Sequence, residues 1–397
     1  MIQPLAITHC TLVNALGKGK AATLQALLQQ RSGLHPCDFL DANLDTFIGR
    51  VAGLEHAPVS SHLADFDCRN NRLAEMGLKQ DDFIAAANAA RQRYGAHRVA
   101  VIMGTSTSGI LQTEQAYRER DPATGALPTP FHYEETHDIA SVAEFTRRFL
   151  QLEGPCIGIS TACSSSAKVF ASAHRLIQSG ACDAAIVGGV DSLCFTTLYG
   201  FSSLELVSTR PCRPADATRD GISIGEAAGF ALLEKIEGAP AADTVALLGY
   251  GESSDAHHMS TPHPEGLGAA LAMQQALQRA GLNPDEIDYI NLHGTASKTN
   301  DSAEDQAVSR IFGRTPCSST KGWTGHTLGA AGITEAIIGY LCILNGFMPG
   351  SQNTETIDPA FSSHVLLRNQ IQPVKNILSN SFGFGGNNCS IVLGKVS

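Results

Sequence analysis

Residues 158–180, GISTACSSSAKVFASAHRLIQSG, constrain the chain most, because they place a cysteine where a buried strand turns into a helix. A thiol at that turn, Cys163, receives the unpaired N–H groups and the partial positive charge of the helix start. This environment favours the thiolate, and the same N–H groups can hold a developing oxyanion. Short side chains around it, Ala162 and Ser164 to Ser166, suit such a turn. The pattern predicts a nucleophile; the alternative is a buried structural cysteine.

Composition excludes several classes of protein. With 397 residues, 43% hydrophobic and 17% charged, the chain is globular and can bury a large core. Its net charge of −10, with no basic run, argues against a general nucleic-acid binder. The N-terminus lacks a signal-like segment, and no run reaches the roughly 18 apolar residues that span a membrane. We therefore expect a soluble, cytoplasmic protein.

The cysteine usage agrees with a reducing compartment. The chain has 11 cysteines, an odd count. The closest pair in sequence, Cys156 and Cys163, forms neither a CxxC redox motif nor a zinc pattern. We expect these residues to be reduced thiols.

Strand and helix patterns alternate through the first half of the chain. The strand at 183–189, DAAIVGG, is continuously apolar, as in a sheet covered on both faces. The strand at 98–103 runs into the small-residue loop 104–109, GTSTSG, and such loops often line a pocket. Strands are expected at residues 5–12, 98–103, 183–189 and 228–235, and helices at 20–30, 81–94 and 140–152.

Three stretches of the first half lack strong periodicity. Residues 54–71 are loop-like and end in CRNNR, whose arginines are candidates for an acidic partner or simply part of a solvated surface. The polar stretch 121–138 could make subunit contacts or form a long surface loop. Residues 208–225 are also expected to be irregular.

The second half repeats the order of the first. From about residue 244 the chain predicts a strand, a helix at 267–280, a strand at 289–292 and a helix at 302–312. CSST at 317–320 then leads into a helix at 328–344, as the Cys163 strand leads into its helix. Both halves close with similar strands, AAGFALLEK and NNCSIVLGK. We infer an α/β protein of two similar halves, residues 1–240 and 241–397, packed as a five-layer α-β-α-β-α body.

Two histidines could work with Cys163. His293 in NLHGTASKTND and His326 in STKGWTGHTLGAAG each lie at the end of an expected strand, within a glycine-containing turn. Either one alone is most simply a hydrogen-bonded structural residue. Two at matching positions in the second half, opposite one cysteine in the first, favour a shared site.

A lysine and a glycine-rich loop complete the candidate set. Lys321 lies in an otherwise uncharged turn, and Glu335 on the following helix can supply the opposite charge, as a functional pair or an ordinary ion pair. In NSFGFGGNN, residues 380–388, the glycines let backbone N–H groups approach a ligand. Phe382 and Phe384 can cover an apolar tunnel. No GxGxxG or GK[ST] phosphate motif is present.

Metal binding is the rival chemistry for these histidines and for His257, His258 and His263. No carboxylate–histidine arrangement with ligand spacing accompanies them, and Cys163 is far from a second thiol in the sequence. We therefore expect no metal and no cofactor.

At these residues the chain closely resembles the β-ketoacyl-[acyl-carrier-protein] synthases, the condensing enzymes that elongate fatty acyl and polyketide chains. The matching segments are TACSSS at Cys163, HGT at His293, Lys321 with GHTLGAAG and Glu335, and NSFGFGGNN. They occur in the family's order over almost the whole length. The resemblance implies a thiolase-type fold, a dimer of identical or related subunits, and an acyl carrier protein with a phosphopantetheine arm as partner.

The resemblance also implies residue roles. Cys163 would hold the acyl chain as a thioester, and His293 and His326 would promote loss of CO2 from the malonyl thioester and stabilise the enolate. Lys321, paired with Glu335, would tune and position the histidines. The backbone N–H groups of Cys163 and Phe384 would form an oxyanion hole, and Phe384 would gate the acyl pocket. Further substrate or pantetheine contacts would come from Thr295, Ser297 (commonly threonine in the family), Phe382 and Thr107.

Two alternatives differ from a condensing enzyme. A degradative thiolase would need a second catalytic cysteine in the C-terminal glycine-rich loop, where this chain has Phe384. A chain-length-determining partner subunit would resemble the synthase but lack the nucleophile, so Cys163 argues against it.

Substrate and carrier contacts are the least constrained expectations. Thr107 replaces a residue that is usually apolar in housekeeping elongating enzymes, so we expect an altered gate to the acyl tunnel and a specialised substrate. The hydroxylated loop 105–108 and the TACSSS turn resemble synthases of polyene or polyketide pathways. The carrier protein is acidic, so a basic patch should surround the tunnel mouth. Arg69, Arg72 and Arg213 are the candidates for this patch.

Overall fold

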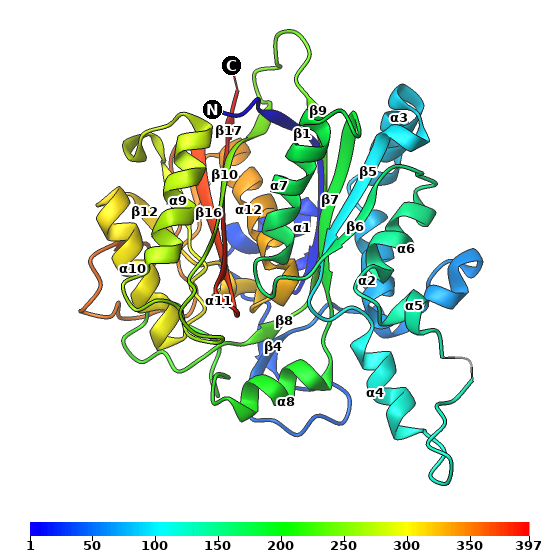
Figure 1. Ribbon diagram of the computed structural model, residues 1–397. Coiled ribbons are helices and arrows are strands. Elements are labelled where there is room, and N and C mark those ends of the chain that lie inside the picture. The colour runs from blue at the N-terminus through cyan, green and yellow to red at the C-terminus, as the bar shows by residue number, and fades with distance from the viewer. Residues whose placement is uncertain (130, 397) are drawn as a thin grey trace.

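One mixed sheet runs through the whole protein (Figure 1). The computed structural model describes residues 1–129 and 131–396. The sheet has two halves, which meet where the first strand of each pairs antiparallel at only two positions, Leu5↔Leu247 and Ala6↔Ala246. The first half-sheet contains, in spatial order, β1 (Leu5–Asn14), β9 (Ala227–Lys235), β7 (Ala184–Asp191), β5 (Val99–Gly104) and β6 (Cys156–Ile159). The second contains β10 (Val245–Ser254), β17 (Asn387–Lys395), β16 (Asn376–Gly383), β11 (Tyr289–Asn291), β12 (Pro316–Ser318) and β14 (His364–Val365).

The two half-sheets share one topology. In each, the opening strand pairs antiparallel with the closing strand, β1 with β9 and β10 with β17. The closing strand then pairs antiparallel with β7 or β16. Parallel strands follow, β5 and β6 in one half, β11 and β12 in the other. The expected likeness of the two halves is therefore confirmed, and β6 and β12 occupy matching positions.

Helices form three layers around the two half-sheets, as Figure 1 shows. The helices α2 (Arg69–Leu78), α3 (Phe83–Tyr94) and α6 (Ser141–Phe149) cover the outer face of the first. The helices α9 (Leu267–Ala280) and α10 (Lys298–Phe312) cover the outer face of the second. Between the half-sheets lie α7 (Ser165–Gln178) and α12 (Ala331–Asn345), which pack in the central core. This is the expected five-layer α-β-α-β-α arrangement.

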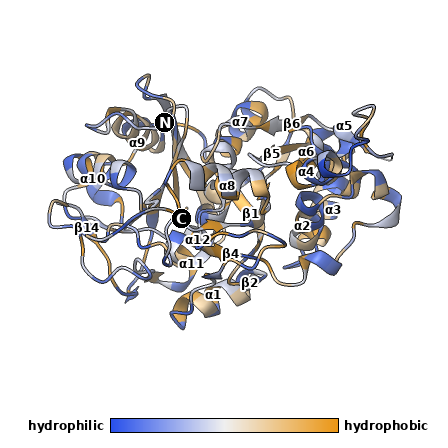
Figure 2. Ribbon diagram, turned by 90° about the horizontal axis from the view of Figure 1, so that it is seen from below, coloured by the Kyte–Doolittle hydropathy of each residue, from blue (hydrophilic) through white to orange (hydrophobic). Residues whose placement is uncertain are grey.

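The central layer explains the most apolar segment of the chain. Residues Leu328–Asn345 are long and apolar enough to cross a membrane, with mean hydropathy 1.5, but 83% of the segment is buried inside the protein. The expectation that no such run exists is therefore wrong for length and composition. Because the segment lies between two half-sheets, most of its apolar surface is covered by protein. By contrast, Figure 2 shows hydrophilic residues on the outer helix α10.

Several elements differ from the sequence expectations. Residues 54–71 are not simply a loop: they form two short 3₁₀ helices, Leu54–His56 and Ser61–Phe66, and then begin α2. The sulfur of Cys68 caps α2 by accepting a hydrogen bond from Asn71 N at 3.4 Å. Besides α2, two further helices of more than one turn were not expected, α4 (Ile110–Arg118) and α8 (Phe195–Ser203). Each buries only two residues, so their apolar periodicity is weak.

The remaining elements are short or agree with expectation. The polar stretch 121–138 contains one helical turn, α5 (Tyr133–Thr136), and its residue 130 lies outside the described residues. Residues 208–225 are largely irregular, as expected. The other elements are α1 (Lys20–Leu28), α11 (Lys321–Thr324), β2 (Gly17–Lys18), β3 (His35–Pro36), β4 (Phe47–Gly49), β8 (Ile224–Gly225), β13 (Phe347–Met348), β15 (Gln370–Ile371) and 3₁₀ turns at Ala96–Arg98, Pro284–Glu286 and Leu328–Ala330.

Candidate active site

Cys163 lies in the sharp turn between β6 and α7, as the sequence predicts. Just before it, Ala162 has a φ of 51°, a left-handed conformation that non-glycine residues adopt only at a cost. The carbonyl of Ala162 accepts hydrogen bonds from Ser165 Oγ at 2.5 Å and Ser106 Oγ at 3.1 Å. These bonds hold the strained turn and fix Cys163 ahead of the helix.

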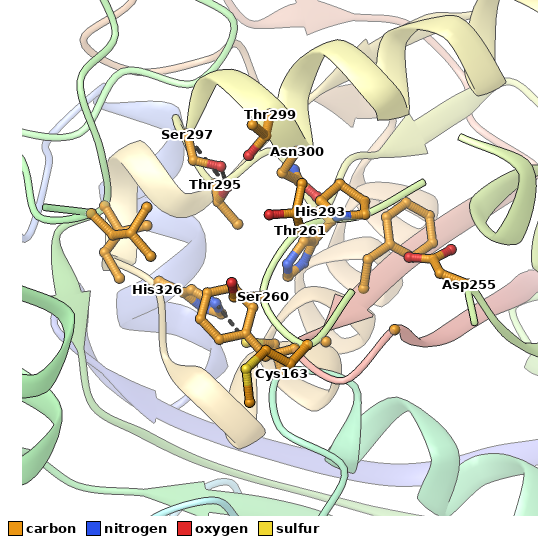
Figure 3. A pocket seen from close by; sticks show the side chains of 18 of the residues that line it. Cys163, Asp255, Ser260, Thr261, His293, Thr295, Ser297, Thr299, Asn300 and His326 are labelled. Carbon is orange, nitrogen blue, oxygen red and sulfur yellow. Dashed lines mark hydrogen bonds between the residues drawn. The ribbon is translucent and has the colours of Figure 1, made fainter. Parts of the chain in front are cut away.

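His326 contacts the nucleophile directly. Its Nε2 lies 3.0 Å from Cys163 Sγ, the contact drawn as a dashed line in Figure 3. Leu328 N donates to the other ring nitrogen, Nδ1, at 3.3 Å, which assigns the proton of the neutral ring to Nε2. Burial, and then the charge of Lys321, lower the pKa of His326 well below its usual value, so the ring is neutral near pH 7.

His293 has the same donor arrangement. It follows β11, and its ring lies 5.4 Å from that of His326, at an interplanar angle of 83°. Lys321 Nζ lies 3.4 Å from His293 Nδ1 and can only donate, so the proton of His293 is also assigned to Nε2. Burial, Lys321 and His326 together lower the pKa of His293 well below its usual value. Two neutral rings thus offer two N–H donors in one buried site.

Lys321 and Glu335 form a buried ion pair behind the imidazoles. Lys321 Nζ lies 2.5 Å from Glu335 Oε1 and donates to the carbonyl of His293 at 2.5 Å. Both side chains are almost fully buried. Burial raises the pKa of Glu335 to about 7, although Lys321 opposes the shift. The pair places the ammonium group against His293, where it fixes the ring and disfavours the imidazolium form.

The resting thiol is less acidic than its place at a helix start suggests. Burial raises the pKa of Cys163 to about 11, while Lys321 and the backbone N–H groups of Phe384 and Cys163 lower it. The expectation that this turn favours the thiolate is therefore wrong for the resting site. Desolvation outweighs the helix start because Cys163 is only 7% exposed.

A pocket that opens to solvent joins these groups, with about 630 Å³ of empty space that includes part of the solvent at its mouth. Cys163, His293 and His326 line it together with Thr295, Ser297, Phe382 and Phe384. In Figure 3, Thr295 and Ser297 lie on the opposite side of the imidazoles from Cys163. Much of the apolar wall comes from four residues that no sequence motif marks, Phe201, Leu206, Ile222 and Met259.

Thr107 does not line this cavity. It is buried, and its hydroxyl donates to Asp191 Oδ1 at 2.8 Å. The expectation that Thr107 contacts substrate is therefore corrected, because its hydroxyl holds a buried carboxylate. Thr107 therefore gives no support for a specialised substrate.

The three arginines expected at the tunnel mouth do not form an exposed basic patch. Arg69 is 5% exposed and makes two hydrogen bonds to Glu226, whose side chain is fully buried. Arg213 is also buried and pairs with Asp220 at 3.0 Å. Arg72 is part-buried and makes two hydrogen bonds to Asp67. Each of these arginines already pairs with a carboxylate of the same chain, so the prediction that they form an exposed patch is wrong.

Among the residues that the structure describes, one group could supply ligands to a metal ion. Ligand atoms of Cys163, His293 and His326 all lie within 4.8 Å of one another. However, each imidazole accepts a hydrogen bond at Nδ1, so the Nε2 atom carries a proton and lacks the lone pair that a metal needs. The group is therefore arranged as two N–H donors beside a thiol.

Some supporting residues gave little signal in the sequence. Glu304 on α10 accepts hydrogen bonds from His293 N and Gly294 N, both at 2.8 Å, and from Asn380 Nδ2 at 3.0 Å. Burial raises the pKa of Glu304 to about 7. A glutamate on a mixed-polarity helix resembles an ordinary surface charge, and only the three-dimensional contacts reveal its role in holding the His293 loop.

Comparison with known proteins agrees with this site. Residues 3–239 match the family model "Beta-ketoacyl synthase, N-terminal domain", and residues 245–355 match "Beta-ketoacyl synthase, C-terminal domain". The 3-oxoacyl-[acyl-carrier-protein] synthase 2 of Vibrio cholerae is 31% identical over 417 residues, which cover 97% of each protein. The mitochondrial 3-oxoacyl-[acyl-carrier-protein] synthase of Arabidopsis thaliana is 39% identical over 263 residues, 62% of this chain and 57% of the relative.

Solved structures show the same fold. The structure of the ketosynthase ApeO in complex with its chain length factor ApeC, from Xenorhabdus doucetiae, matches with a TM-score of 0.89 and 40% identity, over 99% of this chain and 98% of that one. The ishigamide ketosynthase/chain length factor matches with a TM-score of 0.88 and 27% identity over the full length of both chains.

The chain belongs to the β-ketoacyl synthase family of thiolase-fold condensing enzymes. Its reaction class is the condensation catalysed by ketoacyl-acyl-carrier-protein synthases in fatty acid or polyketide synthesis.

Proposed function

We propose that Cys163 carries the growing acyl chain and that His293 and His326 activate the malonyl extender unit. In the first step Cys163 Sγ attacks the acyl thioester carbonyl and displaces the pantetheine sulfur, which takes up the thiol proton. The products are an acyl-Cys163 thioester and a free carrier thiol. Because the resting thiol has a raised pKa, this proton must leave as the bond forms.

The second step forms the carbon–carbon bond. The malonyl thioester loses CO2, and the electron pair of the broken bond forms an enolate whose oxygen carries the negative charge. The Nε2–H groups of His293 and His326 are placed to donate to that oxygen in a site from which burial excludes most water. The enolate carbon then attacks the acyl carbonyl, the bond to Cys163 Sγ breaks, and the cysteine regains a proton. The product is the 3-oxoacyl carrier thioester.

The single observation that carries this proposal is the placement of the thiol 3.0 Å from His326 Nε2, with both imidazoles held as neutral donors on one cavity. The test is mass spectrometry of the intact protein after incubation with an acyl carrier thioester. We expect one acyl adduct, on Cys163, and none on the Cys163→Gln variant. An adduct that survives this substitution, or condensation at the wild-type rate by the variant, would refute the assignment.

The cavity wall supports roles for the other predicted residues. The backbone N–H groups of Cys163 and Phe384 both favour a negative charge on the sulfur, so they suit an oxyanion hole for acyl transfer. Thr295 and Ser297, whose hydroxyls lie 2.9 Å apart, provide polar contacts for the pantetheine amides. Phe384, 36% exposed on a glycine-rich turn, is suited to gate the pocket, beside Phe382.

The partners follow from the same reaction. We propose that residues 1–240 bring the nucleophile and residues 241–397 the histidines, and that an acyl carrier protein delivers both thioesters. The edge strand β6 leaves Ile157 37% exposed, which suits pairing with a second subunit. Similarity to a ketosynthase solved with its chain length factor makes a related subunit, in a heterodimer, the candidate beside a homodimer. Light scattering of the chain alone and after coexpression with such a subunit would separate the two.

The substrate class and the compartment are also proposals. A polyene or polyketide chain is favoured by similarity at 40% identity to a ketosynthase that works with a chain length factor. Turnover of matched saturated and polyunsaturated acyl carriers tests this, and a strict preference for saturated chains would remove it. All 11 cysteines are free, which suits a cytoplasmic protein.

The partner-subunit alternative is a chain-length-determining protein that does not catalyse. It predicts no acyl adduct on Cys163. The part of the chain that the structure describes carries a thiol, two donors and a connected cavity, and these features favour the enzyme.

A further inference from the structure

Asp191, at the end of β7, is a buried carboxylate that does not line the pocket of Cys163. It is fully buried, and none of the ion pairs among the described residues includes it. Instead it is surrounded by N–H and O–H donors. Oδ1 accepts from Thr105 Oγ1 at 2.6 Å and from Ser106 N, Thr107 N and Thr107 Oγ1, each at 2.8 Å, and Oδ2 accepts from Gly329 N at 2.5 Å.

One side of this network leads to the nucleophile. The loop that Asp191 binds, residues 105–107, also presents Ser106 Oγ to the carbonyl of Ala162 at 3.1 Å. Ala162 is the strained residue that precedes Cys163. Asp191 therefore fixes the loop that supports the turn of Cys163.

The other side leads to His326. Gly329, which donates to Asp191 Oδ2, follows Leu328, whose φ is 52° and whose N–H donates to His326 Nδ1 at 3.3 Å. A Cβ on Gly329 would lie 2.7 Å from Asp191 Oδ2, so the carboxylate packs directly against this backbone. Asp191 thus holds the peptide that sets the tautomer and the orientation of the imidazole.

We propose that Asp191 is a positioning residue that sets the contact between Cys163 Sγ and His326 Nε2, because it binds the two loops that carry them. This inference rests on the proposed function of those two residues. Asp191 is hydrogen-bonded to the two loops and to neither the sulfur nor the imidazoles, so it sets the contact through the loops.

The chemistry of the network requires a carboxylate. An asparagine could keep Oδ1 as an acceptor for the 105–107 loop. Its Nδ2–H₂ group would then face the N–H of Gly329, and two donors cannot bond to each other. Asp191→Asn should therefore break the hydrogen bond from Gly329 N while it keeps the volume of the side chain.

Asp191 also opposes formation of the thiolate. Its charge raises the pKa of Cys163, against Lys321, which lowers it; the imidazoles that face the sulfur are neutral. Removal of the charge should make the thiol easier to deprotonate even as the site loses its alignment. Substitution of a residue that only stabilises the fold would not lower the pKa of Cys163 and slow condensation at the same time.

The experiment compares wild type, Asp191→Asn and a matched control, Asp216→Asn. Asp216 is another buried carboxylate that accepts several backbone and hydroxyl donors, from Thr218, Glu355 and Thr356. For each protein we would measure thermal unfolding, the pH profile of Cys163 alkylation by iodoacetamide, and single-turnover condensation from the preformed acyl-enzyme. Mass spectrometry would quantify alkylation at Cys163 itself.

We expect condensation by Asp191→Asn to fall by at least about tenfold, since a misplacement of about 1 Å can cost up to about 100-fold. We expect its alkylation profile to move to lower pH, so that the thiol reacts faster near neutrality, and the control to show neither change. Condensation at the wild-type rate by Asp191→Asn would overturn the proposal, as would a parallel loss in the control. If wild type itself forms no acyl-Cys163, the proposed function fails instead.

Discussion

The pairing of Arg69 with Glu226 makes a quantitative prediction that separates a structural from a docking role for this arginine. Glu226 is fully buried, and its carboxylate also accepts from Val51 N and Leu193 N, so it joins three segments of the chain. Arg69→Met removes the guanidinium group and leaves that carboxylate buried without its cation. Breaking a buried ion pair in this way costs about 3–5 kcal/mol.

The assay is urea unfolding followed by circular dichroism, with carrier-protein KM measured on the same samples. We expect Arg69→Met to lower the free energy of unfolding by about 3–5 kcal/mol and to leave the carrier KM of the folded fraction unchanged. A double variant, Arg69→Met with Glu226→Gln, should recover part of the loss, because the uncompensated charge is gone. Arg72→Met is the control: its pair with Asp67 is part-exposed, so the loss should stay below about 1 kcal/mol.

The reasoning would be refuted by the opposite pattern. If Arg69→Met unfolds at the wild-type urea concentration while the carrier KM rises severalfold, the arginine acts at the surface. The buried geometry would then not describe the working protein.

Three further predictions concern the site. Burial raises the pKa of Glu304 from its usual 4.5 to about 7, so the stability that this group contributes is full below pH 4.5 and is lost as pH rises through about 7. The unfolding free energy of wild type relative to Glu304→Gln should therefore fall between about pH 5 and about pH 8. A difference that does not change with pH would count against the raised pKa. Gly383→Ala would place a Cβ 2.7 Å from Thr161 O and 3.2 Å from Cys163 N, so we expect kcat to fall by about 100-fold, whereas Gly200→Ala, with open space around it, should leave turnover intact. Thr295→Val removes a cavity hydroxyl and should raise the carrier KM with little change in kcat; an unchanged KM would remove Thr295 from the pantetheine contacts.

Much of the architecture could be predicted because its signals are local and strong. The continuously apolar strand β7 predicts a sheet covered on both faces, and all of its residues are buried. The similar sequences of the two closing strands, β9 and β17, indicate two related halves. Helices with little apolar surface, such as α4 and α8, could not be found in the same way.

The candidate catalytic residues could be named from motifs, but their pKa shifts and ion pairs could not. The place of Cys163 at a helix start predicts an acidic thiol, whereas burial raises its pKa to about 11. Similarly, CRNNR looks like an exposed basic cluster, yet Arg69 points inward because Glu226, more than 150 residues away in the sequence, is buried beside it. Such pairings depend on long-range packing and leave no local pattern.

The supporting carboxylates illustrate the same limit. Asp191 follows an apolar strand and Glu304 lies on a polar helix, so neither stands out by composition. Their roles come from the N–H groups that loops from distant parts of the chain direct at them.

The central claim is that two neutral imidazoles, each with its proton on Nε2, stabilise the enolate formed from the malonyl thioester. The most direct measurement is CO2 release from malonyl carrier by the Cys163→Gln variant, with and without His293→Ala. We predict that Cys163→Gln still releases CO2 and that the added His293→Ala slows this release by about 100-fold or more, the typical cost of removing one oxyanion donor. Equal rates of CO2 release by the single and the double variant would contradict the account.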